Sequence, residues 1–177
     1  GRCPELWDGR AAERIVAARP LNVGISVDGA IAAVHDLSRG IKGSLDHIAR
    51  GIGTLRAVRD ERGESFPIRV KPTVHRLNFR EMPALVNWAH DVGATTIDFS
   101  PVRPATPEVE SLLWLQPEDE AELARVVDEW IALRRGGAPI ETEESKLRGF
   151  IGHFKGEVVL PSVAPCRAGM REFHILP

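Results

Sequence analysis

Ser26, Asp28, Gly29 and Arg39 are the residues whose types and spacing best suit the binding of a small charged ligand. Ser26 and Asp28 alternate with apolar residues, so their side chains lie on the same side of the strand expected there. Gly29 lets the backbone turn sharply or approach a ligand, and the planar guanidinium of Arg39 fits a carboxylate. These residues predict a polar pocket for an amino acid's carboxylate and hydroxyl-bearing groups. In the alternative interpretation, Asp28 caps a turn and Arg39 forms a surface ion pair.

The elements that must position these residues follow from the hydrophobic pattern. Alternating sequence predicts strands over 21–28, 68–75 and 96–102, with an irregularity at Pro72 because proline lacks a backbone donor. Helical spacing predicts helices at 43–58, 78–93 and 118–135, and near 147–154. Ser44 is expected to cap the first helix, and Asn78 with Glu81 to form a capping box on the second. Residues 101–117 are expected to form a proline-rich loop.

Alternation of strands and helices with short connections predicts an α/β fold built from about three parallel strand–helix units. Interior strands of a sheet covered on both faces read as nearly continuous apolar runs. Each strand here instead keeps a polar side, made of Ser26 and Asp28, then Arg69, Lys71 and Thr73, then Asp98 and Ser100. Part of a barrel with a wet interior explains this pattern better than a doubly wound sheet.

Several loose motifs in this order resemble the radical S-adenosylmethionine enzymes. They are Ser26-Val27-Asp28-Gly29, His35-Asp36, Arg39-Gly40, Gly43-Ser44, Pro67–Val74, Asn78 and Ile97–Val102, within a resemblance that runs from about Leu6 to about Pro177. The resemblance implies the second half of a partial (β/α)6 TIM-like barrel. It also implies S-adenosylmethionine and a [4Fe-4S] cluster as cofactors, with reductive cleavage of S-adenosylmethionine to a 5′-deoxyadenosyl radical.

The same resemblance implies roles for individual residues. Ser26 and Arg39 would hold the amino-acid part of S-adenosylmethionine, Asp28 and Gly29 would shape the strand end, and Val102 would contact the adenine. A peptide or small-molecule substrate and a reductant such as ferredoxin or flavodoxin are the implied partners. Peptide or protein modification and cofactor biosynthesis are the implied roles.

The cysteines depart from the family pattern. The family holds its cluster with a CxxxCxxC motif, which this chain lacks, and iron–sulfur clusters need such thiolates. We therefore interpret residues 1–137 as strand–helix units 4 to 6 of the barrel and expect the isolated chain to be catalytically inactive. Cys166 and the residues after it are similar to the opening of the SPASM extension, so residues 138–177 are expected to be a linker and its start, with Cys166 as an auxiliary cluster ligand. Cys3 is interpreted as a plain thiol.

Composition narrows the other possibilities. The 177 residues carry a formal charge of −2, so nothing predicts nucleic acid or an anionic membrane as a partner. Two distant cysteines favour a reducing, cytoplasmic location. One alternative is a carbonyl-active, aldolase-like barrel with Lys71 as the Schiff-base nucleophile. Another is a degenerate barrel that serves as a non-catalytic binding module.

Overall fold

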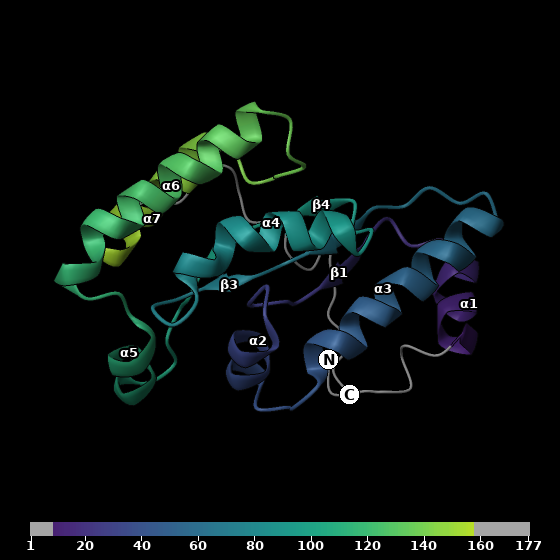
Figure 1. Ribbon diagram of the computed structural model, residues 1–177, viewed down its shortest axis with the longest axis horizontal. Helices are drawn as coiled ribbons and strands as arrows, with labels where there is room; N and C mark the ends of the chain where they lie inside the picture. The colour runs from purple at the N-terminus through teal and green to yellow at the C-terminus, as the bar shows by residue number, and fades with distance from the viewer. Residues whose placement is uncertain (1–8, 158–177) are drawn as a thin grey trace.

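The computed structural model describes residues 9–157, in which helices pack beside a parallel β-sheet (Figure 1). Three strands form the sheet in the order β1-β2-β4 and all run parallel: β1 (Val23–Ile25), β2 (Ile68–Val70) and β4 (Thr96–Ile97). The sheet order therefore follows the chain order, as expected when each strand is joined to the next by a helical crossover.

Two short strands continue the sheet beyond an irregularity. β3 (Thr73–Val74) pairs with β5 (Ser100–Pro101), also in parallel. The backbone N–H of Ser100 donates to the Pro72 carbonyl at 3.2 Å, so the ladder runs on between the two pairs of strands. The break falls at Lys71 and Pro72, where proline cannot donate. The irregularity predicted at Pro72 is therefore confirmed.

Residues 139–141 lie alongside β4 on the side away from β2. Ile97 forms a parallel bridge with Ile140. The N–H of Ile97 donates to the Pro139 carbonyl at 3.0 Å, and the N–H of Glu141 donates back to the Ile97 carbonyl at 2.9 Å. The sheet thus extends in chain order by one further short segment.

The four longer helices have the apolar stripes that the sequence predicted. They are α3 (Ser44–Glu61), α4 (Met82–Asp91), α6 (Glu120–Arg135) and α7 (Glu144–Phe154). Their stripes share one core with the strands, and the rings of Phe99 and Trp130 stack there with centroids 4.8 Å apart. Trp130 also meets Phe150 of α7 edge-on, which fits the position of α6 and α7 side by side in Figure 1.

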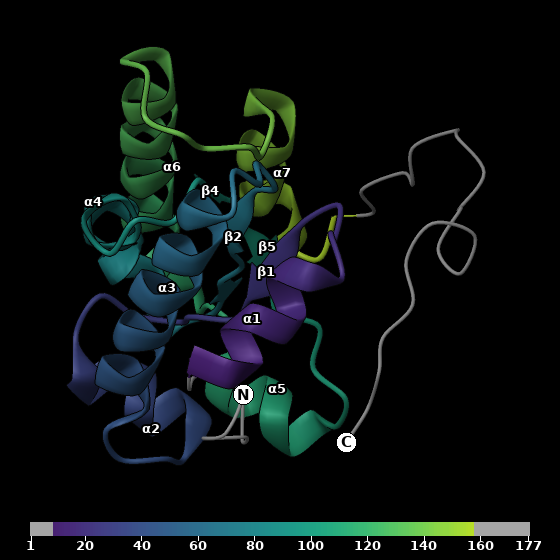
Figure 2. The ribbon, with the colours of Figure 1, turned by 90° about the vertical axis from the view of Figure 1, so that its right-hand side faces the viewer.

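Three further helices were not predicted: α1 (Gly9–Ala17), α2 (Ala32–Arg39) and α5 (Pro107–Leu113). Ala12 and Val16 are the buried residues of α1, which packs beside α3 (Figure 2). The helices α2 and α5 lie at the same end of the molecule in both views, beyond the carboxyl ends of the strands they follow. The region interpreted as a loop over 101–117 therefore contains a helix.

The sheet has one covered face and one open face. Ile25, Val27, Ile68, Val70, Ile97 and Phe99 are all buried on the covered face. On the opposite face Gly24, Ser26, Lys71 and Ser100 are exposed, and Arg69, Thr73, Thr96 and Asp98 are half-buried. Each strand thus has the polar side expected from its sequence. Closure of this sheet into a barrel stays a proposal.

Two predicted helix caps are wrong. Ser44 is the first residue of α3, not its cap; the backbone N–H groups of Gly43 and Leu45 instead donate to the carboxylate of Asp36. Burial raises the pKa of Asp36, but these hydrogen bonds outweigh it and lower the pKa overall. No capping box forms at Asn78, because its side chain accepts from the His75 N–H and donates to other carbonyls.

A buried carboxylate ties the loop after β3 to the start of α6. Asp119, at the end of a short 3-10 helix (η3, Pro117–Asp119), accepts from Arg76 Nε at 3.0 Å and from Arg80 Nη2 at 2.9 Å. Burial raises the pKa of Asp119. The hydrogen bond from the Gln116 N–H and the charges of the two arginines lower it by more, so the pKa lies below its usual value. This clamp holds in place the loop that begins with His75.

Candidate functional site

Asp28 is the centre of a hydrogen-bonded cluster at the carboxyl end of β1. Its side chain is only 4% exposed. Oδ1 accepts from the Thr73 backbone N–H at 2.9 Å, and Oδ2 accepts from Ser38 Oγ at 3.0 Å. Arg39 Nη2 lies 2.8 Å from the same Oδ2. Three donors from two different strand–helix units therefore hold one buried carboxylate, as burial of a charge requires.

His35 supports the backbone of the same strand end. Its Nδ1 accepts from the Asp28 N–H at 3.0 Å, so in the neutral ring the proton is on Nε2, which lies 3.3 Å from Ser44 Oγ. Burial lowers the pKa of His35, although the nearby Asp28 charge acts in the opposite direction. His35 is thus a neutral side chain whose two ring nitrogens connect the end of β1 to the start of α3.

His75, directly after β3, also accepts a backbone N–H at Nδ1 and faces a serine hydroxyl with Nε2. Its Nδ1 accepts from the Leu77 N–H at 3.2 Å, which leaves the proton on Nε2, 3.4 Å from Ser38 Oγ. Burial lowers the pKa of His75, against the opposing effect of Asp28. Asn78 completes the cluster by donating to the Asp28 carbonyl at 2.9 Å.

Gly29 allows α2 to approach the strand end. A Cβ at this position would lie 2.9 Å from Val34 Cβ and Cγ1, and 3.0 Å from the His35 nitrogen. These distances are shorter than real Cβ contacts, so a residue without a side chain is required here. Gly29 was expected to allow a sharp turn or a close approach to a ligand. The structure shows a close approach, but to α2 rather than to a ligand.

The open face of the sheet continues away from Asp28. The strand registers, continued by one residue, place Ser26, Lys71 and Asp98 side by side across three strands. Ser26 and Lys71 are exposed. Asp98 is half-buried and accepts from Thr142 Oγ1 at 2.8 Å. A ligand on this face would meet a hydroxyl, an ammonium group and a carboxylate in one row.

Val102 lies apart from this cluster. It is 6% exposed, its N–H donates to the Val74 carbonyl at 2.9 Å, and its carbonyl lies 3.0 Å from His153 Nε2. The His153 ring packs against Trp114, with centroids 5.0 Å apart. The position predicted to contact adenine is therefore covered by α7 in this structure.

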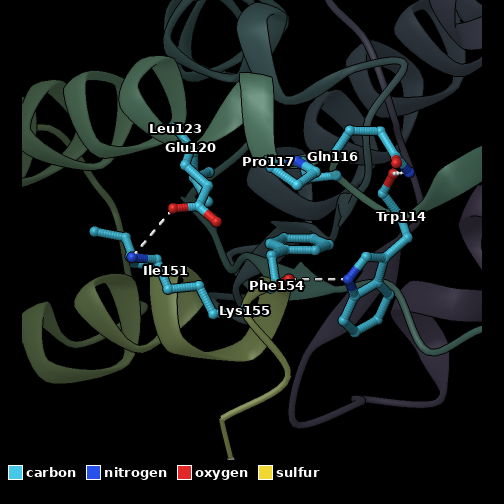
Figure 3. Close-up of a pocket in the computed structure, with 9 residues that line it drawn as sticks. Trp114, Gln116, Pro117, Glu120, Leu123, Ile151, Phe154 and Lys155 are labelled. Atoms are coloured by element: carbon cyan, nitrogen blue, oxygen red, sulfur yellow. Dashed lines mark hydrogen bonds and ion pairs between the residues drawn. The ribbon is translucent and has the colours of Figure 1, made fainter.

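Trp114 also lines a cavity of about 260 Å³ (Figure 3). Its walls combine the polar residues Gln116, Glu120 and Lys155 with apolar ones, which are Trp114, Leu115, Pro117, Leu123, Ile151 and Phe154. Lys155 Nζ and Glu120 Oε2, 3.2 Å apart, connect α7 to α6 beside it, and the Trp114 indole donates to the Phe154 carbonyl at 2.9 Å. It contains none of the residues predicted to bind a ligand.

The structure therefore brings two of the predicted site residues into direct contact, Asp28 and Arg39, with Gly29 adjacent in the chain. Ser26 lies on the open face, Val102 is separate, and Cys166 lies outside the described residues. Sequence reasoning missed the part played by Ser38. A signal was present, because residues at i, i+3 and i+4 share one helix face, and His35, Ser38 and Arg39 have that spacing.

Residues 9–157 do not fit an iron–sulfur cluster. They contain no cysteine, and within this range no group of three or more His, Cys, Asp or Glu side chains is placed to hold a metal ion. No part of the geometry described above can thus be assigned to a cluster.

In the same range, every helix is too short or too polar to cross a membrane.

Comparison with known proteins gives one partial similarity. No protein-family model matches the chain. Over 82 residues it is 32% identical to an AdoMet-dependent heme synthase of Methanosarcina barkeri (strain Fusaro / DSM 804); the match covers 46% of this chain and 22% of that protein. The chain thus matches about a fifth of the length of this relative. The similarity supports a distant, family-level relationship to an S-adenosylmethionine-dependent enzyme.

Proposed function

We propose that this chain forms part of the S-adenosylmethionine-binding barrel of a radical S-adenosylmethionine enzyme. The observation that carries the proposal is the ion pair between buried Asp28 and half-buried Arg39 at the carboxyl end of β1, beside an open polar face of the sheet. In parallel α/β folds, ligands bind at this end of the strands. The partial similarity to a protein named as AdoMet-dependent supports the same ligand.

The proposed ligand contacts use residues that are accessible. Ser26 is exposed on the open face, two residues before Asp28, and the Arg39 side chain is 31% exposed. We assign the amino-acid part of S-adenosylmethionine to Ser26 and Arg39. Asp28 then acts within the protein, since its carboxylate is occupied by three donors. Val102 is assigned to the adenine end only if α7 moves away from it.

The order of the sheet supports a barrel as the surrounding fold. β1, β2, β4 and the segment 139–141 follow one another across the sheet without a reversal. A doubly wound sheet reverses its strand order at the ligand site, whereas a barrel adds each strand to the same side. Because the relative is named a heme synthase, we favour cofactor biosynthesis over peptide modification for the enzyme as a whole.

Titration calorimetry of the 177-residue chain with S-adenosylmethionine tests this proposal. Arg39→Ala should weaken binding about 10- to 100-fold, because a charge-assisted hydrogen bond contributes about 1.5–3 kcal/mol. Arg125→Ala is the matched control; Arg125 forms exposed ion pairs on α6 and should not affect binding. Absence of binding by the parent chain, or equal affinity in Arg39→Ala, would contradict the proposal.

The row formed by Ser26, Lys71 and Asp98 favours one alternative, a carbonyl-active enzyme with Lys71 as nucleophile. A Schiff base between Lys71 and a carbonyl compound would be trapped by borohydride as a stable secondary amine. Mass spectrometry of the chain after treatment with pyruvate and borohydride distinguishes the two functions. Under our proposal Lys71 stays unmodified, and an adduct at Lys71 favours the alternative.

A further inference from the structure

Arg39 has less freedom than a residue in the last turn of a surface helix usually has. Its Nη2 is bound to Asp28, and its Nε is buried with no hydrogen-bond partner in the part of the chain that the structure describes. Two of the three guanidinium nitrogens are thus turned into the protein. Nη1 is the nitrogen left for a ligand, so the orientation of the whole group decides whether a ligand carboxylate is met correctly.

That orientation depends on Asp28 Oδ2, which Arg39 shares with Ser38. The Ser38 hydroxyl has a single proton, and it is donated to Oδ2 at 3.0 Å. The contact of 3.4 Å with His75 Nε2 must therefore be one in which the imidazole donates and the hydroxyl accepts. The hydrogen bonds thus run in one direction: His75 Nε2–H donates to the Ser38 hydroxyl, and the Ser38 hydroxyl donates to Asp28 Oδ2.

We propose that Ser38 and His75 are positioning residues, which act through Asp28 to hold the Arg39 guanidinium ready for a ligand carboxylate. This rests on the proposed function for the identity of the ligand, but the orientation of Arg39 is a property of the chain alone. Asp28 and Arg39 cancel each other's charge, and both nearby histidines are neutral in the arrangement described. The site therefore suits the carboxylate of a zwitterionic amino-acid group better than a compact, multiply charged anion such as phosphate.

Ser38→Ala is the informative variant, because Ser38 is exposed and its hydroxyl can be removed without disturbing the core. Ser38→Thr keeps the hydroxyl and should rescue the effect. Ser44→Ala is the matched control, since Ser44 also contacts a histidine Nε2 but has no contact with Asp28 or Arg39. Retained amide spectra show that each variant is folded.

The first measurement needs no ligand. The Arg39 Nε–H is buried, so its proton should exchange slowly and its ¹H–¹⁵N signal should report a rigid side chain. Ser38→Ala should accelerate that exchange about threefold or more, as expected from loss of one hydrogen bond, while Ser38→Thr and Ser44→Ala should leave it unchanged. Equal exchange in Ser38→Ala and the parent chain would overturn the proposal.

The second measurement is calorimetry with S-adenosylmethionine and with inorganic phosphate. Ser38→Ala should weaken S-adenosylmethionine binding about 3- to 10-fold, and phosphate should bind neither protein. Unchanged affinity in Ser38→Ala, or competition by phosphate, contradicts the positioning proposal. If the parent chain does not bind S-adenosylmethionine but Arg39 becomes mobile in Ser38→Ala, then the proposed function fails and the positioning role stands.

Discussion

The two buried histidines of the site each accept a hydrogen bond from a backbone N–H group rather than from a charged side chain. His35 and His75 each accept a backbone N–H at Nδ1, from Asp28 and Leu77 respectively. A proton on Nδ1 would break that hydrogen bond, and burial already disfavours the charged ring. Burial and this hydrogen bond therefore both favour the neutral ring. Each Nδ1 can accept its backbone N–H only when the ring is neutral.

The stability of the chain should therefore fall as the pH drops below about 6.5, the ordinary histidine pKa. Burial lowers the pKa of both histidines in the folded state. At a pH between the folded-state pKa and 6.5, the unfolded chain therefore binds more protons than the folded chain. The free energy of unfolding should decrease by up to about 1.4 kcal/mol per pH unit for each histidine and level off below the folded-state pKa. Urea denaturation between pH 7.5 and 5 measures this slope.

His75→Gln should remove about half of that pH dependence, because one of the two buried imidazoles is then absent. His90→Gln is the control, since His90 is exposed on α4 and should leave the slope as it is. A slope that is the same in His75→Gln as in the parent chain would show that His75 is not held neutral by the fold.

At the residue scale, the sequence identified the polar residues but not their pairing. Asp28 and Arg39 were each expected to serve the ligand or to act separately, and the structure joins buried Asp28 to half-buried Arg39 in an ion pair. The pairing depends on the angle at which α2 leaves β1, which no residue pattern specifies. His75 and Asp98 likewise bond to partners that their spacing does not reveal, Ser38 and Thr142.

At the scale of elements, the longer helices were predicted and the shorter ones were not. α3, α4, α6 and α7 each bury an apolar stripe and were predicted from it. α5 buries none of its residues, and its apolar spacing, at Val109, Leu112 and Leu113, spans only about one turn. α2 buries only His35 and leaves Leu37 exposed. α1 was missed as well, although it buries Ala12 and Val16, so the three missed helices share their short length rather than an absence of apolar contacts.

The position of α2 on β1 should depend on Gly29. Gly29→Ala should destabilise the chain by about 1–3 kcal/mol, because its Cβ would overlap Val34 and the His35 nitrogen and force α2 outward. Gly53→Ala is the control: Gly53 is in α3 with nothing within 4 Å of an added Cβ, so alanine there should stabilise by about 0.5–1 kcal/mol. Equilibrium denaturation of both variants compares them, and a neutral Gly29→Ala would show that α2 is not packed closely.

At the scale of the whole molecule, the sheet has one face packed against the core and one face that is open. The covered side carries the core, while the open side carries exposed Ser26, Lys71 and Ser100. The sequence predicted this difference because it alternates within each strand. It could not predict how far the sheet curves or whether further strands close it, since these depend on contacts between segments distant in the chain.

Two substitutions, one in β2 and one directly after it, test this one-sided arrangement. Ile68 is fully buried on the covered side, so Ile68→Ala should destabilise the chain by about 2–5 kcal/mol. Lys71 is exposed on the open side, so Lys71→Ala should change stability by no more than about 0.5 kcal/mol. Urea denaturation of the 177-residue chain measures both. A large loss in Lys71→Ala would mean that the polar face is covered in solution, and the open surface on which a ligand is proposed to bind would not exist.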